Sequence, residues 1–465
     1  MHSAVIVGLQ YGDEGKARVV DDQSSRYDIV ARFNGGANAG HTVEANGVRV
    51  ALNQVPSGIF YPDKKLYIGS GCVVNIKKLY DEIKRLNEIG IKLEGRLHIS
   101  PQAGIIQAHH VAIDTLIGGE VGTTKNGIGP AYADRALRMW GDRLLNLRMG
   151  DMKSDPEAVL EMIKKNYEES AKIYNLSNID VVQFLDEIKS SLDVVLPFVE
   201  MNPLFLKQQV DGGATVIFEG AQSFMLDVNK GDVPYVTSSH TASAAAHIGG
   251  DLPTRYHGKT IGIAKAIMSR VGHGPFVSEF GGAESEEYCM SYNETGGPLY
   301  GRAVESAYDI EALLASENSM DMSKAIRNLS GEYGTVTTRP RRVGALDLVQ
   351  LRYAIQANGV DEMVITKCDL LNIYSRTAKG KIPMVVAYEL DGQKIDYLPG
   401  STFSYKKVKP VFEYFDSFTE DVSGVRKFED LPMALQNLVK KVEEFTGCPV
   451  KGLGVGPARE HYVAR

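Results

Sequence analysis

Short runs of wholly apolar, often β-branched residues recur along this 465-residue chain, and longer stretches with helical periodicity separate them. Strands are expected at Val5–Gly8, Ile29–Phe33, Leu97–Ile99, Ala214–Phe218, Ile261–Ala264, Met363–Lys367, Met384–Tyr388 and Val450–Val455. Helices are expected near Ile76–Ile89, Pro156–Tyr174, Gly344–Ala357 and Leu431–Phe445, where apolar residues recur three or four apart. Strands that are apolar throughout indicate burial on both faces. The pattern therefore predicts an α/β fold with a large, mostly parallel central sheet, flanked by helices and carrying inserted subdomains.

The chain shows no internal repeat and no low-complexity linker, so we expect a single domain over residues 1–465. Residues 281–331 differ from the rest because they are rich in Glu, Ser, Gly and Met. They contain a loop-like stretch, YNETGGPLYG, and helical runs near Ala307–Ala315 and Met320–Leu329. We interpret 281–331 as an insertion or a lid within the domain.

Composition excludes several classes of protein. The net charge is −7 and no block of Lys and Arg occurs, which argues against a nucleic-acid-binding surface. No stretch approaches the roughly 20 apolar residues that cross a bilayer, and the first residues lack signal-peptide features. The four cysteines are scattered, which argues against a disulfide framework or a zinc site. We expect a soluble cytoplasmic protein without a membrane or nucleic-acid partner.

Residues 8–20 read GLQYGDEGKARVV and follow the first expected strand. A glycine-rich turn between a strand and a helix binds phosphate through backbone N–H groups. The stretch departs from an ordinary P-loop, because Ala17 stands where a Mg²⁺-binding Ser or Thr is needed. Asp13 accounts for this departure if its carboxylate binds Mg²⁺ or acts as a general base. The alternative is a glycine turn beside a solvated acidic pair.

Six more motifs accompany GDEGK, in a fixed order. They are GGANAGHT at 35–42, GTTKNGIGPAY at 122–132, FEGAQSFML at 218–226, PYVTSSHT at 234–241, TTRPRRVGALD at 337–347 and TKCDLL at 366–371. Together they resemble the adenylosuccinate synthetase family, from about residue 4 to about residue 460. The resemblance implies a ligase of the AMP branch of purine biosynthesis. It would join IMP and L-aspartate with GTP and Mg²⁺ to give adenylosuccinate, GDP and phosphate, through a 6-phosphoryl-IMP intermediate.

The resemblance also implies roles for single residues. Asp13 would take the N1 proton of IMP, His41 would donate toward the γ-phosphate, and Gln222 would hold the 6-oxyanion. Asp13 and the carbonyl of Gly40 would bind Mg²⁺. The expected IMP contacts are Asp13, Glu14, Gly15, Lys16, Asn38, Ala39, Gly40, His41, Thr124, Arg138, Gln222, Thr237 and Arg339. Arg138 would come from a neighbouring subunit, which implies a homodimer; the alternative is a solvated helix arginine.

Two further sets follow from the same resemblance. The expected GTP contacts are Gly12, Asp13, Glu14, Gly15, Lys16, Ala17, Arg18, Gly40, His41, Thr42, Arg341, Lys367, Cys368, Asp369, Gly454, Val455 and Gly456. Asp369 would accept hydrogen bonds from guanine, although by itself it also fits the start of a helix. The expected aspartate contacts are Thr335, Val336, Thr337, Thr338, Arg339, Pro340 and Arg341. Arginine forks suit carboxylates, but the same stretch alone would fit a solvated basic turn.

Several positions depart from the family pattern, namely Arg18, Asn34, Ala37, Asn126, Val336 and Gly454, and 281–331 is longer than its counterpart. A second hypothesis therefore keeps the mechanism with another acceptor nucleotide, amino donor or nucleoside triphosphate. A third is a catalytically silent GTP-binding regulator. Elsewhere, we expect His109 and His110 to pack in a core and Trp140 to lie at a subunit contact.

Overall fold

The computed structural model describes residues 2–45, 47–117, 123–293, 297–334 and 338–465. Within these residues, nine strands form a central sheet in the order β21-β20-β16-β12-β1-β11-β2-β5-β7. The strands are β1 (Ser3–Gly8), β2 (Ile29–Arg32), β5 (Lys65–Ile68), β7 (Leu97–Ile99), β11 (Val216–Ser223), β12 (His257–Lys265), β16 (Glu362–Thr366), β20 (Val450–Gly454) and β21 (Tyr462–Ala464). Every neighbouring pair is parallel except β20 and β21. The predicted α/β class and mostly parallel sheet are confirmed.

Strand β1 lies at the centre of the sheet and is buried on both faces. Val5 and Val7 belong to one core cluster, while Ala4 and Ile6 belong to another, and none of the four is more than 1% exposed. Successive side chains of a strand point to opposite faces, so the two clusters are the two sides of the sheet. This double burial explains why the strand is apolar at every position.

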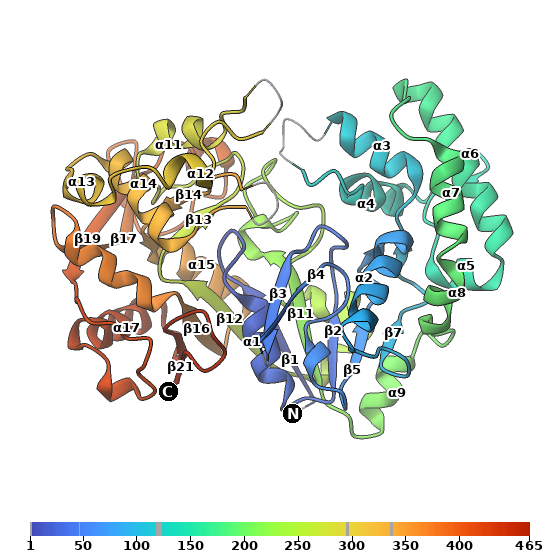
Figure 1. Ribbon diagram of the computed structural model, residues 1–465, viewed down its shortest axis with the longest axis horizontal. Helices are drawn as coiled ribbons and strands as arrows, with labels where there is room; N and C mark the ends of the chain where they lie inside the picture. The colour runs from blue at the N-terminus through green and yellow to red at the C-terminus, as the bar shows by residue number, and fades with distance from the viewer. Residues whose placement is uncertain (1, 46, 118–122, 294–296, 335–337) are drawn as a thin grey trace.

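Helices cover both sides of the sheet, with the N-terminal half of the chain on one flank and the C-terminal half on the other (Figure 1). The helices are α1 (Lys16–Ser24), α2 (Ile76–Glu88), α3 (Ala108–Ile117), α4 (Ile128–Leu137), α5 (Met149–Ser154), α6 (Pro156–Tyr174), α7 (Val181–Lys189), α8 (Leu192–Val195), α9 (Phe205–Asp211), α10 (Ala245–Gly249), α11 (Gly282–Cys289), α12 (Arg302–Glu305), α13 (Ile310–Ala315), α14 (Ser319–Ser330), α15 (Leu348–Asn358), α16 (Thr402–Tyr405) and α17 (Met433–Thr446). In the described part of the chain, none of them combines the length and apolar character that a membrane span needs.

Shorter strands form small additional sheets. They are β3 (His41–Ala45), β4 (Val48–Leu52), β6 (Val73–Val74), β8 (Gly104–Ile105), β9 (Met139–Trp140), β10 (Arg143–Leu144), β13 (Met268–Arg270), β14 (Arg342–Gly344), β15 (Leu346–Asp347), β17 (Lys381–Leu390), β18 (Gln393–Ile395) and β19 (Lys409–Asp416). The predicted strand Met384–Tyr388 lies in β17, which pairs with β15, β18 and β19 outside the central sheet. The expectation that it belongs to a single central sheet was wrong, because an apolar run shows burial and not its partner strand.

Two predicted boundaries also shift. The helix expected from Gly344 begins at Leu348, because the carboxylate of Asp347 accepts the backbone N–H of Gln350 and caps the first turn (3.0 Å). The strand expected to reach Lys367 ends at Thr366. Lys367 adopts a left-handed backbone conformation (φ 60°) and begins the 3₁₀ segment Cys368–Arg376.

The described part of 281–331 contains helices α11 to α14. A fully buried ion pair joins Arg327 of α14 to Glu305 of α12, with an Nη2–Oε1 distance of 2.7 Å. Helix α14 also packs against β14 and against the 3₁₀ segment that follows Lys367. These contacts attach the segment to the part of the domain that carries Arg339, Arg341 and Arg342.

The parallel strands bring the motifs together. The stretch after β1 contains Asp13, the stretch after β2 contains Gly40, and Lys367 follows β16. Gln222 lies at the end of β11. The carboxyl ends of parallel strands share one edge of a sheet, and ligands bind outside that edge in open α/β sheets.

Candidate active site

Two adjoining cavities of about 600 and 1010 Å³ lie at this edge, and both are lined by Asp13, Asn38, Ala39, Gly40 and Arg341. Of the residues predicted from the sequence, the first is also lined by Gly12, Glu14, Gly15, Lys16, Ala17, Arg18, His41, Thr42, Gln222 and Thr338. The second is also lined by Thr124 and Arg339. Most of the predicted IMP and phosphate contacts therefore surround one connected space.

The loop after β1 has an unusual backbone. Gly12, Asp13 and Gly15 all have positive φ, of 103°, 58° and 80°. This left-handed region suits glycine but is strained for an aspartate. Gly8 is required for a different reason, since a Cβ there would lie 2.2 to 2.7 Å from the side-chain ends of Ser223, Glu14 and Lys16. The loop thus presents Asp13 outward and turns Glu14 inward.

Glu14 is a structural residue of this loop. It is 1% exposed and accepts hydrogen bonds from the backbone N–H of Gly12 (2.9 Å), from Lys16 Nζ (2.7 Å) and from Ser223 Oγ (2.6 Å). Burial raises the pKa of the Glu14 carboxyl, but the ammonium groups of Lys16 and Lys265 outweigh this and lower it. The negative charge inside the predicted phosphate loop is therefore neutralised within the protein.

Asp13 is exposed to both cavities and forms an ion pair with Arg341. Its Oδ2 lies 2.8 Å from Arg341 Nη2, and Arg341 Nη1 lies 2.9 Å from Oε2 of Glu332. Arg341 thus connects an exposed carboxylate to a buried one. The guanidinium of Arg341 offsets the negative charge that Asp13 would bring close to bound phosphate groups.

Glu332 is the centre of a buried ionic cluster that the sequence analysis missed. It is not exposed, and it accepts hydrogen bonds from Lys367 Nζ and from Ser269 Oγ (2.8 Å), while Lys265 Nζ lies 3.7 Å away. Burial alone would raise the pKa of Glu332, but the surrounding lysines and Arg341 hold it well below its usual range. The cluster fixes Arg341 and Lys367 relative to each other.

His41 is oriented by a second buried carboxylate. His41 Nδ1 is hydrogen-bonded to Oε1 of Glu219. The hydroxyl of Ser57 donates to the same oxygen, and the backbone N–H of Ser57 donates to Oε2 (2.8 Å). Desolvation raises the pKa of Glu219, but His41 and Arg32 lower it to about 2. Burial lowers the pKa of His41 despite this carboxylate. Glu219 was not among the residues predicted from the sequence. A single carboxylate within the mostly apolar strand that contains FEGAQ was the feature that could have revealed it.

Gln222 adopts a left-handed backbone conformation (φ 58°) and lines the first cavity. Its buried Oε1 has no hydrogen-bond partner among the described residues. Asn34 holds the adjacent backbone, because its side chain donates to the carbonyl of Ala221 (3.1 Å) and accepts from the N–H of the same residue (2.8 Å). Asn34, which departs from the family pattern, therefore holds the backbone next to Gln222 and lines neither cavity.

The oxygen atoms near Asp13 suit Mg²⁺. The Asp13 carboxylate and the backbone of Gly40 both line the two cavities, and Gly40 is exposed. Mg²⁺ prefers oxygen ligands and is commonly held by one or two carboxylates together with substrate phosphates. The donor set therefore fits the predicted ion.

The predicted guanine-binding residues lie outside the two cavities. These residues are Lys367, Cys368, Asp369, Gly454, Val455 and Gly456. Arg18 connects the phosphate loop to this region, because its guanidinium donates to the carbonyls of Gly456 (2.5 Å) and His461 (2.8 Å). The Cys368 thiol is buried and contacts the carbonyl of Ile365 (3.4 Å), so any contact of Cys368 with GTP would come from its backbone.

The remaining predicted residues are distributed as follows. Thr335, Val336 and Thr337 lie outside the described residues. Pro340 is buried and forms an antiparallel bridge with Tyr333. Thr237 and Arg138 do not line either cavity. Arg138 is exposed just after the C-terminus of α4.

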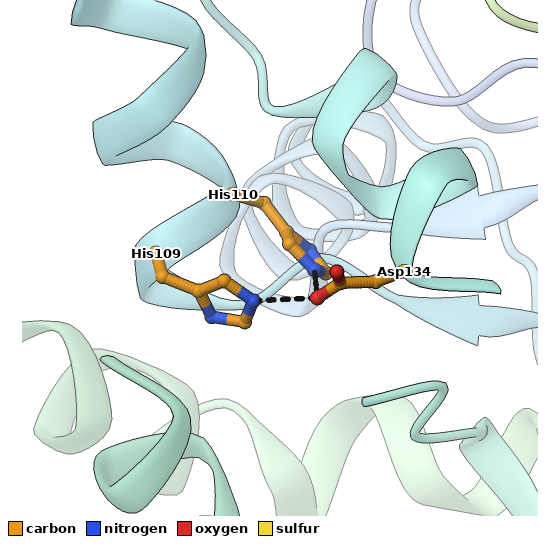
Figure 2. A group of neighbouring side chains, drawn as sticks. All are labelled: His109, His110 and Asp134. Atoms are coloured by element: carbon orange, nitrogen blue, oxygen red, sulfur yellow. Dashed lines mark hydrogen bonds and ion pairs between the residues drawn. The ribbon is translucent and has the colours of Figure 1, made fainter. Parts of the chain in front are cut away.

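His109 and His110 are buried, as expected, and their rings form a polar cluster with Asp134. Figure 2 shows both rings directed at one carboxylate, with Nε2–Oδ2 distances of 2.7 and 3.0 Å. Three such groups could hold a metal ion, but His110 Nδ1 already accepts the N–H of Gln107 (3.0 Å). Its Nε2 therefore carries the proton, which suits a hydrogen bond to Asp134 and not a metal bond. The cluster joins α3 to α4.

Known proteins match this chain over nearly its whole length. The family described as adenylosuccinate synthetase matches residues 5–463. Adenylosuccinate synthetase 2 of Cupriavidus pinatubonensis is 45% identical over 459 residues, covering 98% of this chain and 96% of that protein. The adenylosuccinate synthetase of Fusobacterium nucleatum is 36% identical over 468 residues, covering 100% of this chain and 99% of that protein.

Solved structures agree. The fully ligated adenylosuccinate synthetase of Plasmodium falciparum matches with a TM-score of 0.84 at 29% identity, covering 100% of both chains. A cyanophage S-2L succinoaminodeoxyadenylate synthetase matches with a TM-score of 0.58 at 19% identity, covering 100% of this chain and 95% of that chain, and shows the shared fold alone. The match across nearly the whole length shows that this chain belongs to the adenylosuccinate synthetase family.

Proposed function

We propose that this chain joins IMP to L-aspartate with GTP, giving adenylosuccinate, GDP and phosphate. The observation that carries the proposal is Asp13, a carboxylate exposed where the two cavities meet and faced by the guanidinium of Arg341. One space can hold the acceptor base while the adjoining loop holds the phosphates of the donor.

Asp13 takes the N1 proton of IMP, which makes O6 nucleophilic. O6 then attacks the γ-phosphorus of GTP, the bond to the β–γ bridging oxygen breaks, and GDP leaves. The amine of aspartate adds at C6 and displaces the 6-phosphoryl group as phosphate, while the nitrogen loses a proton. Positioning and charge stabilisation supply most of the catalysis in phosphoryl transfer of this kind.

His41 and Gln222 stabilise the charges that develop. The hydrogen bond from His41 Nδ1 to Glu219 fixes the ring, so that Nε2 is the nitrogen available to the departing GDP side of the γ-phosphate. The amide of Gln222 holds the 6-oxyanion. The amide nitrogen of Gln222 is the group that donates to this anion. The buried Oε1, unpaired among the described residues, is an acceptor and requires a donor group from the ligand.

Mg²⁺ would be held by Asp13 and the carbonyl of Gly40. When bound, it would screen the negative charge of the donor phosphates. Asp13 would therefore both bind the ion and take the N1 proton, which explains why a carboxylate is retained inside a phosphate-binding loop.

The aspartate substrate would be bound by Thr338, Arg339, Pro340 and Arg341, together with residues 335–337. Arg339 and Thr338 line different cavities, and Arg341 lines both. The guanine base would be bound by Lys367, Cys368 and Asp369 and by Gly454, Val455 and Gly456. Arg18 connects this region to the phosphate loop through the carbonyl of Gly456.

We further propose that residues 281–331 act as one wall of the site. Arg302 and Gly331 line the first cavity, and Tyr292 accepts a hydrogen bond from Arg339 (2.5 Å). A lid role for this segment would be supported by reduced proteolysis within it when substrates are added.

A homodimer, with Arg138 acting in the partner's site, is also proposed. Apolar side chains are exposed beside Arg138, namely Leu137, Met139, Trp140 and Leu144. An exposed apolar patch of this kind marks an interaction surface. Sedimentation equilibrium tests the dimer, and recovered activity in a mixture of Arg138→Ala and Asp13→Asn chains tests the shared site.

A cytoplasmic location is proposed too, supported by the four cysteines, which are buried and free in the described chain.

The experiment for the proposed function omits one substrate at a time. Purified protein receives IMP, aspartate, GTP and Mg²⁺, and the purine is followed by ultraviolet absorbance. Product only with all four supports the proposal. Product only with GMP, another amino acid or ATP would favour altered specificity, and GTP binding without any nucleotide product would favour a regulator.

A further inference from the structure

Lys78 projects from α2 into the second cavity. The helix begins at Ile76 because the side chain of Asn75 accepts the backbone N–H of Lys78 (3.0 Å). Lys78, Glu82 and Arg85 recur at helical spacing, and all three line the cavity. One face of α2 therefore forms part of the wall of a cavity that Arg339 and Arg341 also line.

The acidic side chains that line this cavity in the described chain already have partners. They are Asp13 with Arg341 (2.8 Å), Asp81 with Lys77 (2.6 Å), and Glu82 with the backbone N–H groups of Asn53 and Gln54 (2.8 and 2.9 Å). Lys78 forms no ion pair among the described residues, and its ammonium is hydrogen-bonded to the neutral Oδ1 of Asn126. Desolvation lowers the pKa of Lys78. Among the described residues, therefore, no acidic side chain is paired with this cation of the cavity wall.

The amide of Asn126 links Lys78 to Thr124. Its oxygen faces the ammonium of Lys78, and its nitrogen donates to the hydroxyl of Thr124 (3.0 Å). Thr124 and its neighbour Lys125 also line the cavity. Lys78 and Thr124 are therefore held on either side of one amide, with the hydroxyl and the ammonium both at the cavity wall.

We propose that Lys78 binds an oxyanion of a substrate, and that Asn126 holds the ammonium in place for it. This inference rests on the proposed function. The oxyanion is the 5′-phosphate of the acceptor nucleotide or a carboxylate of the amino donor, and the link to Thr124 favours the phosphate. Asn126 is neutral, so at this part of the cavity wall the positive charge comes from the ammonium of Lys78 on α2.

The test compares Lys78→Met with Lys84→Met. Met keeps the apolar stem and removes the charge, and Lys84 is an exposed lysine of the same helix that lines neither cavity. Calorimetry measures the binding of IMP and of inosine, and steady-state assays measure KM for IMP, aspartate and GTP. A charged hydrogen bond lost from a ligand corresponds to about a 10- to 100-fold loss of affinity.

A 10- to 100-fold weaker affinity for IMP, with inosine binding unchanged, supports the phosphate. A similar rise in KM for aspartate alone supports the carboxylate. In either case Lys78→Arg is expected to retain most of the affinity, and Lys78→Met/Asn126→Lys to recover part of it. Affinities within twofold of the parent, or an equal loss for GTP, would overturn the inference. The proposed function fails separately, if the parent chain neither binds IMP nor forms product.

Discussion

Arg341 holds Asp13 at a distance of 2.8 Å, and the same guanidinium is anchored on buried Glu332. The carboxylate with the most demanding proposed role is therefore positioned by a cation that is itself fixed in the protein. This arrangement places a fixed positive charge against Asp13 inside a phosphate-binding loop.

Asp13→Asn keeps the size of the side chain but removes its ability to accept the N1 proton. We expect turnover to fall by about 10²- to 10⁴-fold, the usual range for a general base. The free energy of unfolding should change little, because Asp13 is exposed. The matched control is Asp63→Asn, an exposed aspartate paired with Lys64. Initial rates and urea unfolding check both variants; near-parental turnover in Asp13→Asn would remove Asp13 from the role of base.

Glu332→Gln should strongly destabilise the chain. The substitution leaves Lys265, Lys367 and Arg341 without the buried carboxylate that they share. Breaking a buried ion pair costs about 3–5 kcal/mol of the free energy of unfolding.

The control for this variant is Glu311→Gln, in which an exposed pair with Arg376 is lost at a cost of about 1 kcal/mol or less. Urea titration measures both. Equal stabilities of the two variants would mean that the cluster around Glu332 has no special energetic role.

Asp369→Asn should weaken the use of GTP and leave IMP binding intact. An amide cannot accept two hydrogen bonds from guanine as a carboxylate does. We expect KM for GTP to rise by about 10- to 100-fold, while KM for IMP stays within about twofold. Parallel changes in both constants would show that Asp369 does not read the base of the donor nucleotide.

Acid should destabilise the chain in part through His110. Burial, and then the neighbouring His109, lower the pKa of His110 to about 4, although Asp134 raises it. The unfolded chain has an ordinary histidine pKa of about 6.5, so it binds the proton first as the pH falls. Stability from this group is complete above about pH 6.5 and is lost between about pH 6.5 and 4, by at most about 3 kcal/mol.

His110→Gln isolates this contribution, because glutamine can still donate to Asp134 but does not titrate. Unfolding free energies of the parent and the variant are compared from pH 8 to pH 4. The variant should show the shallower decline, since other titrating groups are common to both chains. Identical slopes would contradict the assignment.

The sequence predicted a phosphate-binding turn directly after the first strand, and the structure places this turn after β1. The family resemblance named Asp13, His41 and Gln222 as site residues, and all three line the first cavity. The sequence did not predict which buried side chains hold the site in place. His41 and its partner Glu219 are 178 residues apart in the sequence, and Glu332 and Ser269 of the buried ionic cluster are 63 apart. Such pairings depend on tertiary structure, which local patterns do not encode.

Other differences have the same origin. The apolar run at Met384–Tyr388 predicted a strand correctly but not its sheet. Arg18 was expected near phosphate, and its guanidinium instead reaches two carbonyls of the C-terminal segment while the residue still lines the cavity. Glu14 appeared to be a second carboxylate for ligands, but Lys16 and Ser223 enclose it. The direction of a side chain cannot be read from its motif.

The central claim is that O6 of the acceptor purine attacks the γ-phosphorus and leaves as part of phosphate. The most direct measurement uses IMP labelled with ¹⁸O at C6, with mass analysis of the phosphate that is released. The account predicts one ¹⁸O atom in each phosphate formed. Release of the label into water, with unlabelled phosphate, would contradict it.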